Sequence, residues 1–146
     1  MEDIKKILAV SWMTQYCRRT VHYAVSMAKK YGAELSVIHV IDTIWLQSWN
    51  LPTISVAKEH QKDLERIGAT LDNIIDSETK GDVKIKKFIK EGDAVEEILK
   101  CIAEEKIDLV ILRAHEESRI ERFLVRGSND EIIRRMPCSI FLVKSE

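Results

Sequence analysis

Short apolar runs separated by amphipathic segments are the feature that most constrains the fold of this chain. The runs Ile7–Val10 and Leu109–Leu112 contain no polar residue, which is typical of strands covered on both faces. Between such runs, apolar residues recur at helical spacing, as in the series Leu64, Ile67 and Leu71. We expect strands at residues 4–11, 33–41, 83–89, 109–112 and 139–144, and helices after Cys17, from about Ser55 to Glu78, after Asp93 and after Ser128.

The order of these elements predicts an α/β fold. Strands that alternate with helices form mainly parallel sheets, because right-handed crossovers return each strand in the same direction. We expect a single Rossmann-like, doubly wound domain over residues 1–146, with five mainly parallel strands and helices on both faces. Such sheets bind ligands beyond the carboxyl ends of their strands, where the strand order reverses.

Composition and charge exclude several classes of partner. The apolar fraction of 45% and the charged fraction of 32% are those of an ordinary soluble globular protein. The net charge of −1 gives no overall attraction to nucleic acid or to an anionic membrane. No apolar run approaches the roughly 18 residues that a membrane span needs. The N-terminal residues lack a signal-peptide pattern, so we expect a cytoplasmic protein with no nucleic-acid or membrane partner.

Residue types used in catalysis and in metal binding are scattered along the chain. Cys17, Cys101 and Cys138 show neither CxxC nor metal-ligand spacing, and we expect them to be reduced, buried thiols. The four histidines share no ligand spacing, so no metal site is expected. The chain has no Ser-His-Asp elbow and no Gly-Lys-Ser/Thr phosphate loop. We therefore expect no catalytic residue and no enzymatic activity.

The turn Gly127–Ser128–Asn129 is the candidate ligand site. A Gly-Ser turn in front of a helix is where parallel α/β proteins hold phosphates, because free backbone N–H groups and the helix dipole converge there. The same residues also fit a plain helix cap, in which Ser128 and Glu131 bond each other's amides. Arg113, at the start of the loop leading to this turn, is either a ligand contact or an exposed loop charge.

Five stretches of the chain stand out by their order and spacing. They are residues 6–10 (Lys-Ile-Leu-Ala-Val), 23–35, 39–42 (His-Val-Ile-Asp), 91–93 (Glu-Gly-Asp) and 134–138 (Arg-Arg-Met-Pro-Cys). Together they resemble the universal stress protein family. The resemblance covers essentially the whole chain. It implies a five-stranded parallel sheet, dimers that pair through the last strand in many members, and ATP binding in some members.

The ATP motif that this resemblance brings with it is altered here. The ATP-binding members carry Gly-x-x-Gly, nine further residues, and then Gly-Ser or Gly-Thr. In this chain the first two glycines fall on Arg113 and Glu116, and the third falls on Arg126, one position before Gly127. Those members also place an aspartate after the first strand, where this chain has Trp12.

These differences favour a stress-response or adaptor protein with a degenerate nucleotide site. Glycines in a phosphate loop let backbone N–H groups approach the anion, whereas Arg or Glu side chains fill that space. We expect no bound cofactor. The alternative is ATP or another adenine nucleotide held by Gly127, Ser128 and the loop arginines, with Ile41 beside the adenine ring. A third hypothesis is a slow nucleotide hydrolase, in which Asp42 or Asp93 would coordinate a metal ion near the phosphates.

The last strand is the candidate dimer interface. Ile140, Phe141, Leu142 and Val143 would form a flat apolar edge guarded only by Lys144, and proteins seldom leave such edges bare. We therefore expect a homodimer that pairs through this strand. The lysine-rich strand at 83–89 instead suits an exposed edge. The loop with Trp45 and Trp49 has two alternative interpretations. It either forms a patch that binds a partner or ligand, or it folds back over the sheet.

Overall fold

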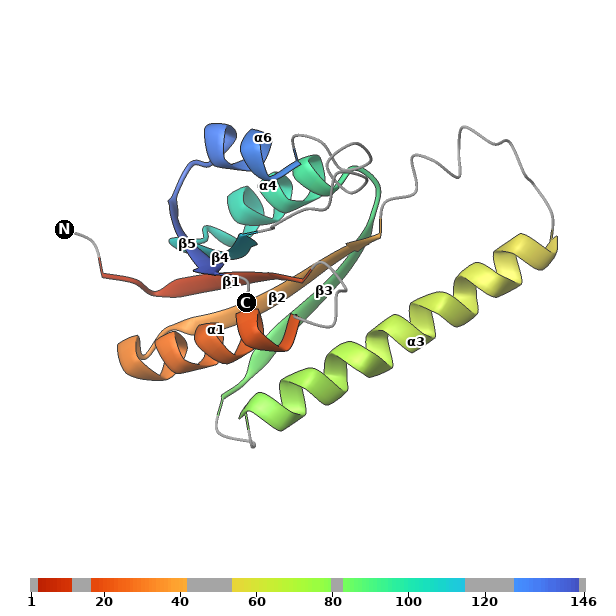
Figure 1. The fold of residues 1–146 in the computed structure, drawn as a ribbon, viewed down its shortest axis with the longest axis horizontal. Helices are drawn as coiled ribbons and strands as arrows, with labels where there is room; N and C mark the ends of the chain where they lie inside the picture. Colours follow the sequence, from red (N-terminus) through yellow and green to blue (C-terminus); the bar gives the residue numbers. More distant parts are fainter. Residues whose placement is uncertain (1–2, 12–16, 42–53, 80–82, 115–127, 145–146) are drawn as a thin grey trace.

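The computed structural model describes residues 3–11, 17–41, 54–79, 83–114 and 128–144. Five strands form one sheet in the order β3-β2-β1-β4-β5, and every neighbouring pair is parallel (Figure 1). The strands are β1 (Lys6–Ser11), β2 (Glu34–Ile41), β3 (Ile85–Glu91), β4 (Leu109–Ala114) and β5 (Ser139–Lys144). The predicted α/β fold with a five-stranded parallel sheet is confirmed.

Helices cover both faces of the sheet. The crossovers are α1 (Cys17–Tyr31), α3 (Ile54–Thr79), α4 (Ala94–Glu105) and α6 (Ser128–Arg135). Side chains of α1 and α3 belong to one core cluster, and side chains of α4 and α6 belong to the other. The chain therefore leaves β1 and β2 toward one face of the sheet and leaves β3 and β4 toward the opposite face. The strand order reverses between β1 and β4 for this reason.

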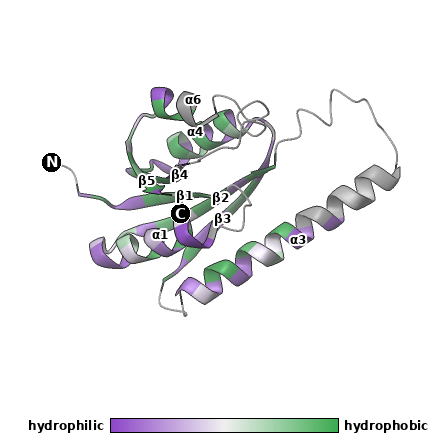
Figure 2. Cartoon of the chain, in the orientation of Figure 1, coloured by the Kyte–Doolittle hydropathy of each residue, from purple (hydrophilic) through white to green (hydrophobic). Residues whose placement is uncertain are grey.

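The core consists of two apolar layers separated by the sheet. Ile7 and Ala9 of β1 pack with Leu71 of α3 on one face, while Leu8 of the same strand packs with Ile98 of α4 on the other. All five of these side chains are completely buried. Figure 2 shows the hydrophobic residues along the central strands, with hydrophilic residues interspersed along α1. Burial on both faces explains why β1 and β4 are apolar without alternation.

The first and second strands begin slightly later than predicted, and the third and fourth strands end later than predicted. The third strand covers Ile85–Glu91 rather than 83–89, because its pairing with β2 continues until Ile41 lies opposite Glu91. The fourth strand continues past Leu112 to Ala114, because Arg113 pairs with Val143 of β5. Both errors occur at charged strand ends, where no apolar residue marks the continuation of the ladder.

The side chain of Asp108 joins the beginnings of β1 and β4. Its Oδ2 atom accepts hydrogen bonds from the backbone N–H of Lys5 at 3.0 Å and of Lys6 at 2.9 Å. The backbone N–H of Asp108 donates to the carbonyl oxygen of Lys6 at 2.9 Å. These hydrogen bonds satisfy backbone polar groups that would otherwise lack a partner where the parallel pairing of β1 and β4 begins.

The helix expected after Asp93 is α4, and Asp93 itself caps it. The residue has extended backbone angles, and its Oδ1 atom accepts a hydrogen bond from the N–H of Glu96 at 3.0 Å. Glu96 and Glu97 lie in the first turn, where negative charge complements the helix dipole. The turn before the cap contains Gly92, whose φ of 136° is a conformation that side chains rarely adopt.

Removing this cap is expected to destabilise the protein modestly. Asp93→Ala leaves the N–H of Glu96 without its side-chain acceptor, so we expect a loss of about 1 kcal/mol in the free energy of unfolding. Chemical denaturation followed by circular dichroism measures the difference. Asp93→Asn keeps a capping oxygen and is the matched control. Equal losses in the two variants would contradict the capping role.

The described cysteines differ in burial. Cys101 of α4 is buried as predicted, whereas Cys138 before β5 is only partly buried, which corrects the prediction for that residue. Burial, and then the negative charge of Glu105, raises the pKa of Cys101 to about 11. Burial also raises the pKa of Cys138. Both thiols are therefore protonated at neutral pH and are poor nucleophiles. The side chain of Cys17 lies outside the described part.

None of the described helices is long and apolar enough to cross a membrane.

Candidate functional site

The carboxyl ends of β1 and β4 lie side by side where the strand order reverses. These strands pair up to Ala9 opposite Ile111, and Ser11 and Arg113 lie two residues further along each strand. The chain then continues to α1 on one face and to α6 on the other (Figure 1). Doubly wound sheets bind ligands in the crevice that this divergence creates. The connecting segments 12–16 and 115–127 lie outside the described residues.

A row of three buried polar side chains marks this end of the sheet. Ser11 is 1% exposed, His39 is 4% exposed and Arg113 is 8% exposed. Ser11 pairs directly with His39 on β2. Because alternate residues of a strand share a face, all three continue the columns of apolar residues that face α1. The row is thus buried between the sheet and the layer that contains α1.

The backbone of β1 holds the ring of His39. The Nδ1 atom lies 3.0 Å from the carbonyl oxygen of Ser11. A carbonyl oxygen can only accept, so Nδ1 carries the proton and donates it. Burial lowers the pKa of His39, and the bond to Ser11 opposes this effect only in part. The ring is therefore neutral at pH 7, with Nε2 as a hydrogen-bond acceptor.

Acidification is expected to destabilise the protein through His39. The pKa of this residue in the folded state lies below its ordinary value of 6.5. The unfolded state therefore binds the proton more readily, and the stability that neutral His39 contributes is lost as the pH falls below 6.5 toward the folded-state pKa. Urea unfolding of the wild type and of His39→Gln at about pH 7.5 and about pH 5 measures this effect. We expect a smaller loss on acidification in the variant; an identical loss would rule out His39 as its source.

Arg113 does not lie in a loop. It is the fifth residue of β4, and its side chain is buried, so the exposed-loop interpretation is wrong. The apolar run ends at Leu112, and sequence reasoning took the following arginine as the start of the loop. Pairing with Val143 of β5 keeps the residue in the sheet and directs its side chain toward α1. A buried guanidinium is costly unless its surroundings compensate the charge, so this position is energetically constrained.

The other predicted nucleotide contacts are described only in part. Ile41 is half-buried at the end of β2, and its carbonyl oxygen accepts a hydrogen bond from the N–H of Gly92 at 3.0 Å. Ser128 and Asn129 begin α6, as predicted, but their side chains lie outside the described part. Gly127 lies outside the described residues altogether. The choice between an anion turn and a plain cap at Ser128 stays open.

The hydrolase hypothesis places metal-dependent chemistry near this end. Asp93, one of the two carboxylates considered for it, is engaged as the cap of α4. Asp42 lies outside the described residues. Within the described ranges, no three His, Cys, Asp or Glu side chains converge on a position that could hold a metal ion.

His39 and Ser11 were missed as site residues. The signal was available, because each lies two residues beyond an apolar position that faces the same side, Val37 in β2 and Ala9 in β1. Polar residues in phase with a buried column are candidates for buried polar groups. In the sequence, His39 stands out only as one of four scattered histidines and as part of the matching stretch 39–42.

The last strand forms one edge of the sheet, with unequal exposure of its apolar side chains. Leu142 is 49% exposed, and Ile140 and Phe141 are partly buried. Phe141 packs against Tyr23 of α1, with ring centroids 5.7 Å apart. Val143 is 1% exposed and belongs to the core. Its side chain is therefore not available to a second copy, and Leu142 is the most exposed of the four predicted interface residues.

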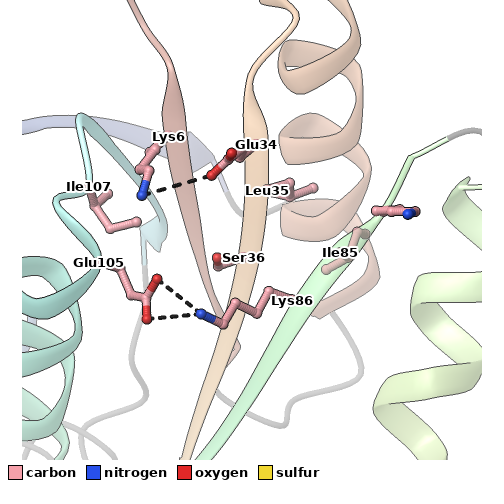
Figure 3. Close-up of a pocket in the computed structure, with 9 residues that line it drawn as sticks. Lys6, Glu34, Leu35, Ser36, Ile85, Lys86, Glu105 and Ile107 are labelled. Atoms are coloured by element: carbon pink, nitrogen blue, oxygen red, sulfur yellow. Dashed lines mark hydrogen bonds and ion pairs between the residues drawn. The ribbon is translucent and has the colours of Figure 1, made fainter.

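A groove of about 480 Å³ lies at the opposite, amino-terminal end of the sheet (Figure 3). Lys6 and Glu34 approach within 3.8 Å on one side of it, and Lys86 and Glu105 approach within 3.1 Å on the other. Ser36, which is 8% exposed, lies between these two ion pairs. This end of the sheet is remote from the crevice between β1 and β4, so the groove is a separate surface.

Comparison with known proteins identifies the family. The sequence profile of the universal stress protein family matches residues 3–144. The chain belongs to this family. It is 22% identical over 152 residues to a universal stress protein of Methanothermobacter thermautotrophicus, a match that covers 99% of both chains. The resemblance inferred from the sequence is therefore confirmed.

Solved universal stress proteins share the fold. One in complex with cAMP superposes with a TM-score of 0.73 at 14% identity, covering 99% of this chain and 100% of the other. The universal stress protein from Archaeoglobus fulgidus in complex with dAMP gives a TM-score of 0.66 at 15% identity, with the same coverage. Nucleotides are thus bound by some structural neighbours. At these identities the likeness establishes the architecture and not the ligand of this chain.

Proposed function

We propose that this family member is a cytoplasmic stress-response protein that acts through protein contacts as a homodimer, with a degenerate site that does not hold ATP. The observation that carries the proposal is the burial of Arg113 at the carboxyl end of β4. This position corresponds to the first glycine of the ATP motif in the nucleotide-binding members. The activity proposed is binding of partners and not catalysis.

The size and charge of Arg113 support this proposal. Glycine exposes backbone at such a position, so a phosphate can approach it closely. Arginine places a long side chain beside the backbone instead, and here that side chain is packed beneath the α1 layer. The sequence adds Glu116 at the second glycine position, where a carboxylate would repel a polyphosphate. Trp12 in place of the family's aspartate is a third change in the same motif.

The exposed edge of β5 supports the homodimer. Leu142 is 49% exposed on a strand whose outer side is paired with no other strand in the described sheet. Pairing of two β5 strands would satisfy their backbone groups and cover Leu142 in both copies. The free thiols Cys101 and Cys138 suit the reducing environment of the cytoplasm.

A second candidate function is adenine-nucleotide binding. The complexes of structural neighbours with cAMP and dAMP favour it. So does the chemistry of Arg113, because a guanidinium near the crevice could form a charge-assisted contact with a phosphate. Gly127 and Ser128 would then supply backbone N–H groups at the start of α6. The two candidates differ in whether a measurable affinity for nucleotide exists.

Calorimetric titration with ATP, AMP and cAMP separates the two functions. We expect no binding at ligand concentrations up to about 1 mM, which corresponds to a binding free energy weaker than about −4 kcal/mol. A dAMP-binding relative titrated under the same conditions is the positive control. Binding that is saturable below this concentration, and that is lost in Gly127→Asp, would refute the proposed function and establish the second candidate. Magnesium-dependent ATP turnover that survives repurification would likewise contradict the non-enzymatic assignment.

A further inference from the structure

The outer edge of β3 is an open pairing surface. Seven consecutive residues, Ile85–Glu91, pair in parallel with β2, and β3 is the terminal strand of the sheet on that side. The other side of its backbone pairs with no strand in the described sheet. A strand in this position presents a row of N–H and C=O groups that another extended chain can bind.

Apolar side chains along β3 are incompletely covered by the protein itself. None of its seven residues is buried, whereas five of the six residues of β1 are. Ile85, Phe88 and Ile89 are each only partly buried. Leu71 of α3 belongs to the core cluster against which Ile85 and Ile89 pack, but in Figure 1 the N-terminal end of α3 extends beyond the sheet. A chain added at this edge would cover apolar surface that the fold leaves accessible.

Positive charge is concentrated at the same edge. Residues 84–91 contain four lysines and one glutamate, although the whole chain has a net charge of −1. Two of these lysines are already engaged, since Lys86 contacts Glu105 of α4 at 3.1 Å and Lys87 contacts Asp72 of α3. Lys84 and Lys90 have no ion pair with the described carboxylates. The two lysines outside these ion pairs therefore lie near the two ends of the strand, where Lys84 shares a pocket with Asp76 and Lys90 shares one with Glu97.

The lysines are arranged around an aromatic centre. The Nζ atoms of Lys86 and Lys90 lie 5.0 and 5.7 Å from the centroid of the Phe88 ring. Lys84 directly precedes β3 and lines two pockets, one with Lys86 and one with Lys87. The spacing from Lys84 to Lys90 is roughly 20 Å in an extended chain. The edge thus has cations at both ends and an apolar ring between them. The groove in Figure 3 adjoins its beginning, where Lys84 and Lys86 line it together with Ser36.

We propose that the outer edge of β3 binds an acidic, extended segment of a partner protein as an added strand. The segment would carry carboxylates near both ends and an apolar side chain opposite Phe88. Charge complementarity selects this occupant over the others. A second copy of the same edge would bring lysine rows together, and like charges on adjacent strands are destabilising. Nucleic acid lacks the peptide N–H and C=O groups that an added strand needs to continue the ladder of β3. The proposal rests on the interaction role proposed above and gives it a partner class.

Peptide binding measured by fluorescence anisotropy tests this proposal. The probe is a capped, fluorescent nine-residue peptide with glutamates at both ends and alternating valine and threonine between them. One comparison peptide carries lysine in place of each glutamate, and a second has two central prolines that prevent strand pairing. We expect binding of the acidic peptide alone, weakening as sodium chloride is raised because exposed charges are screened. Backbone amide shifts in β3, and not in β5, should accompany it.

Two charge-matched double variants locate the site. Lys84→Glu/Lys90→Glu is expected to weaken binding at least about tenfold, because it reverses both terminal charges. Lys29→Glu/Lys30→Glu makes the same change in charge on exposed residues of α1 and should leave the affinity within about twofold. If the first variant unfolds, Lys84→Gln/Lys90→Gln provides the same comparison, with a smaller expected loss of peptide affinity.

Several outcomes would overturn the proposal. In the peptide experiments, these are equal affinity for the acidic and basic peptides, equal losses of affinity in the two double variants, or amide shifts at β5 instead of β3. Self-association through β3 would also contradict it, as would preferential binding of a single-stranded oligonucleotide used as competitor. None of these outcomes bears on the nucleotide titration. Failure of the β3 proposal can therefore be told apart from failure of the proposed function.

Discussion

Replacing Leu142 by glutamate is expected to dissociate the proposed homodimer into monomers. Leu142 is the most exposed large apolar side chain of β5, and two-fold pairing of β5 strands would bring residue 142 of both copies into the interface. The substitution removes apolar contact area from each copy and introduces two negative charges into one interface. Burial of the unpaired charges is what makes the effect large. We expect the dissociation constant of the dimer to rise by about 100-fold or more.

Sedimentation velocity at micromolar to tens-of-micromolar concentration measures this change. Ile133→Glu is the matched control, because Ile133 is a similarly exposed apolar residue, 42% accessible, on α6 and not on the edge strand. We expect the control to remain dimeric. A wild-type protein that is monomeric throughout this concentration range would contradict the proposed homodimer. Dissociation of both variants alike would show that the interface is not specific to β5.

Truncating Leu8 to alanine is expected to be the most destabilising single change that keeps an apolar residue. Leu8 is completely buried at the centre of β1, between Ser36 of β2 and Val110 of β4. Neighbouring strands on both sides limit how far the structure can collapse into the space left behind. We expect a loss of about 3 to 4 kcal/mol, including the cost of the cavity. This is a large part of the roughly 5 to 15 kcal/mol that stabilises a typical domain.

Urea unfolding followed by circular dichroism gives the free-energy difference. Leu8→Met nearly conserves volume and should cost less than about 1.5 kcal/mol. Ile133→Ala removes an exposed apolar side chain, and we expect a change of no more than about 0.5 kcal/mol. A small effect of Leu8→Ala, comparable with that of Ile133→Ala, would mean that the central strand is less tightly enclosed than described.

The fold was predictable because the strongest signals in the sequence are apolar and local. Apolar runs such as Ile7–Val10 are typical of strands that are covered on both faces. Each helix between these strands buries one apolar stripe. Asp93 followed by Glu96 fixes the start of α4 within a residue. Pairing beyond the apolar run is not encoded locally, which is why β4 extends unexpectedly over Arg113 and why β3 ends two residues late.

The candidate site was predictable only in position. The strand order places it outside β1 and β4, and the altered glycine motif indicates which residues to inspect. Sequence spacing does not show that Arg113 is buried, nor that His39 and Ser11 lie beside each other on neighbouring strands. Those relations arise from register between segments more than 20 residues apart along the chain. Long-range register of this kind becomes visible only when the sheet is assembled.

Native mass spectrometry of the protein purified directly from cells tests the central claim most directly, because it reports bound ligand and stoichiometry in one measurement. The account predicts a species of two chains, each of 16.9 kDa, with no added mass of an adenine nucleotide. Dimers that carry one adenine nucleotide per chain would contradict it and would favour the adenine-nucleotide-binding function.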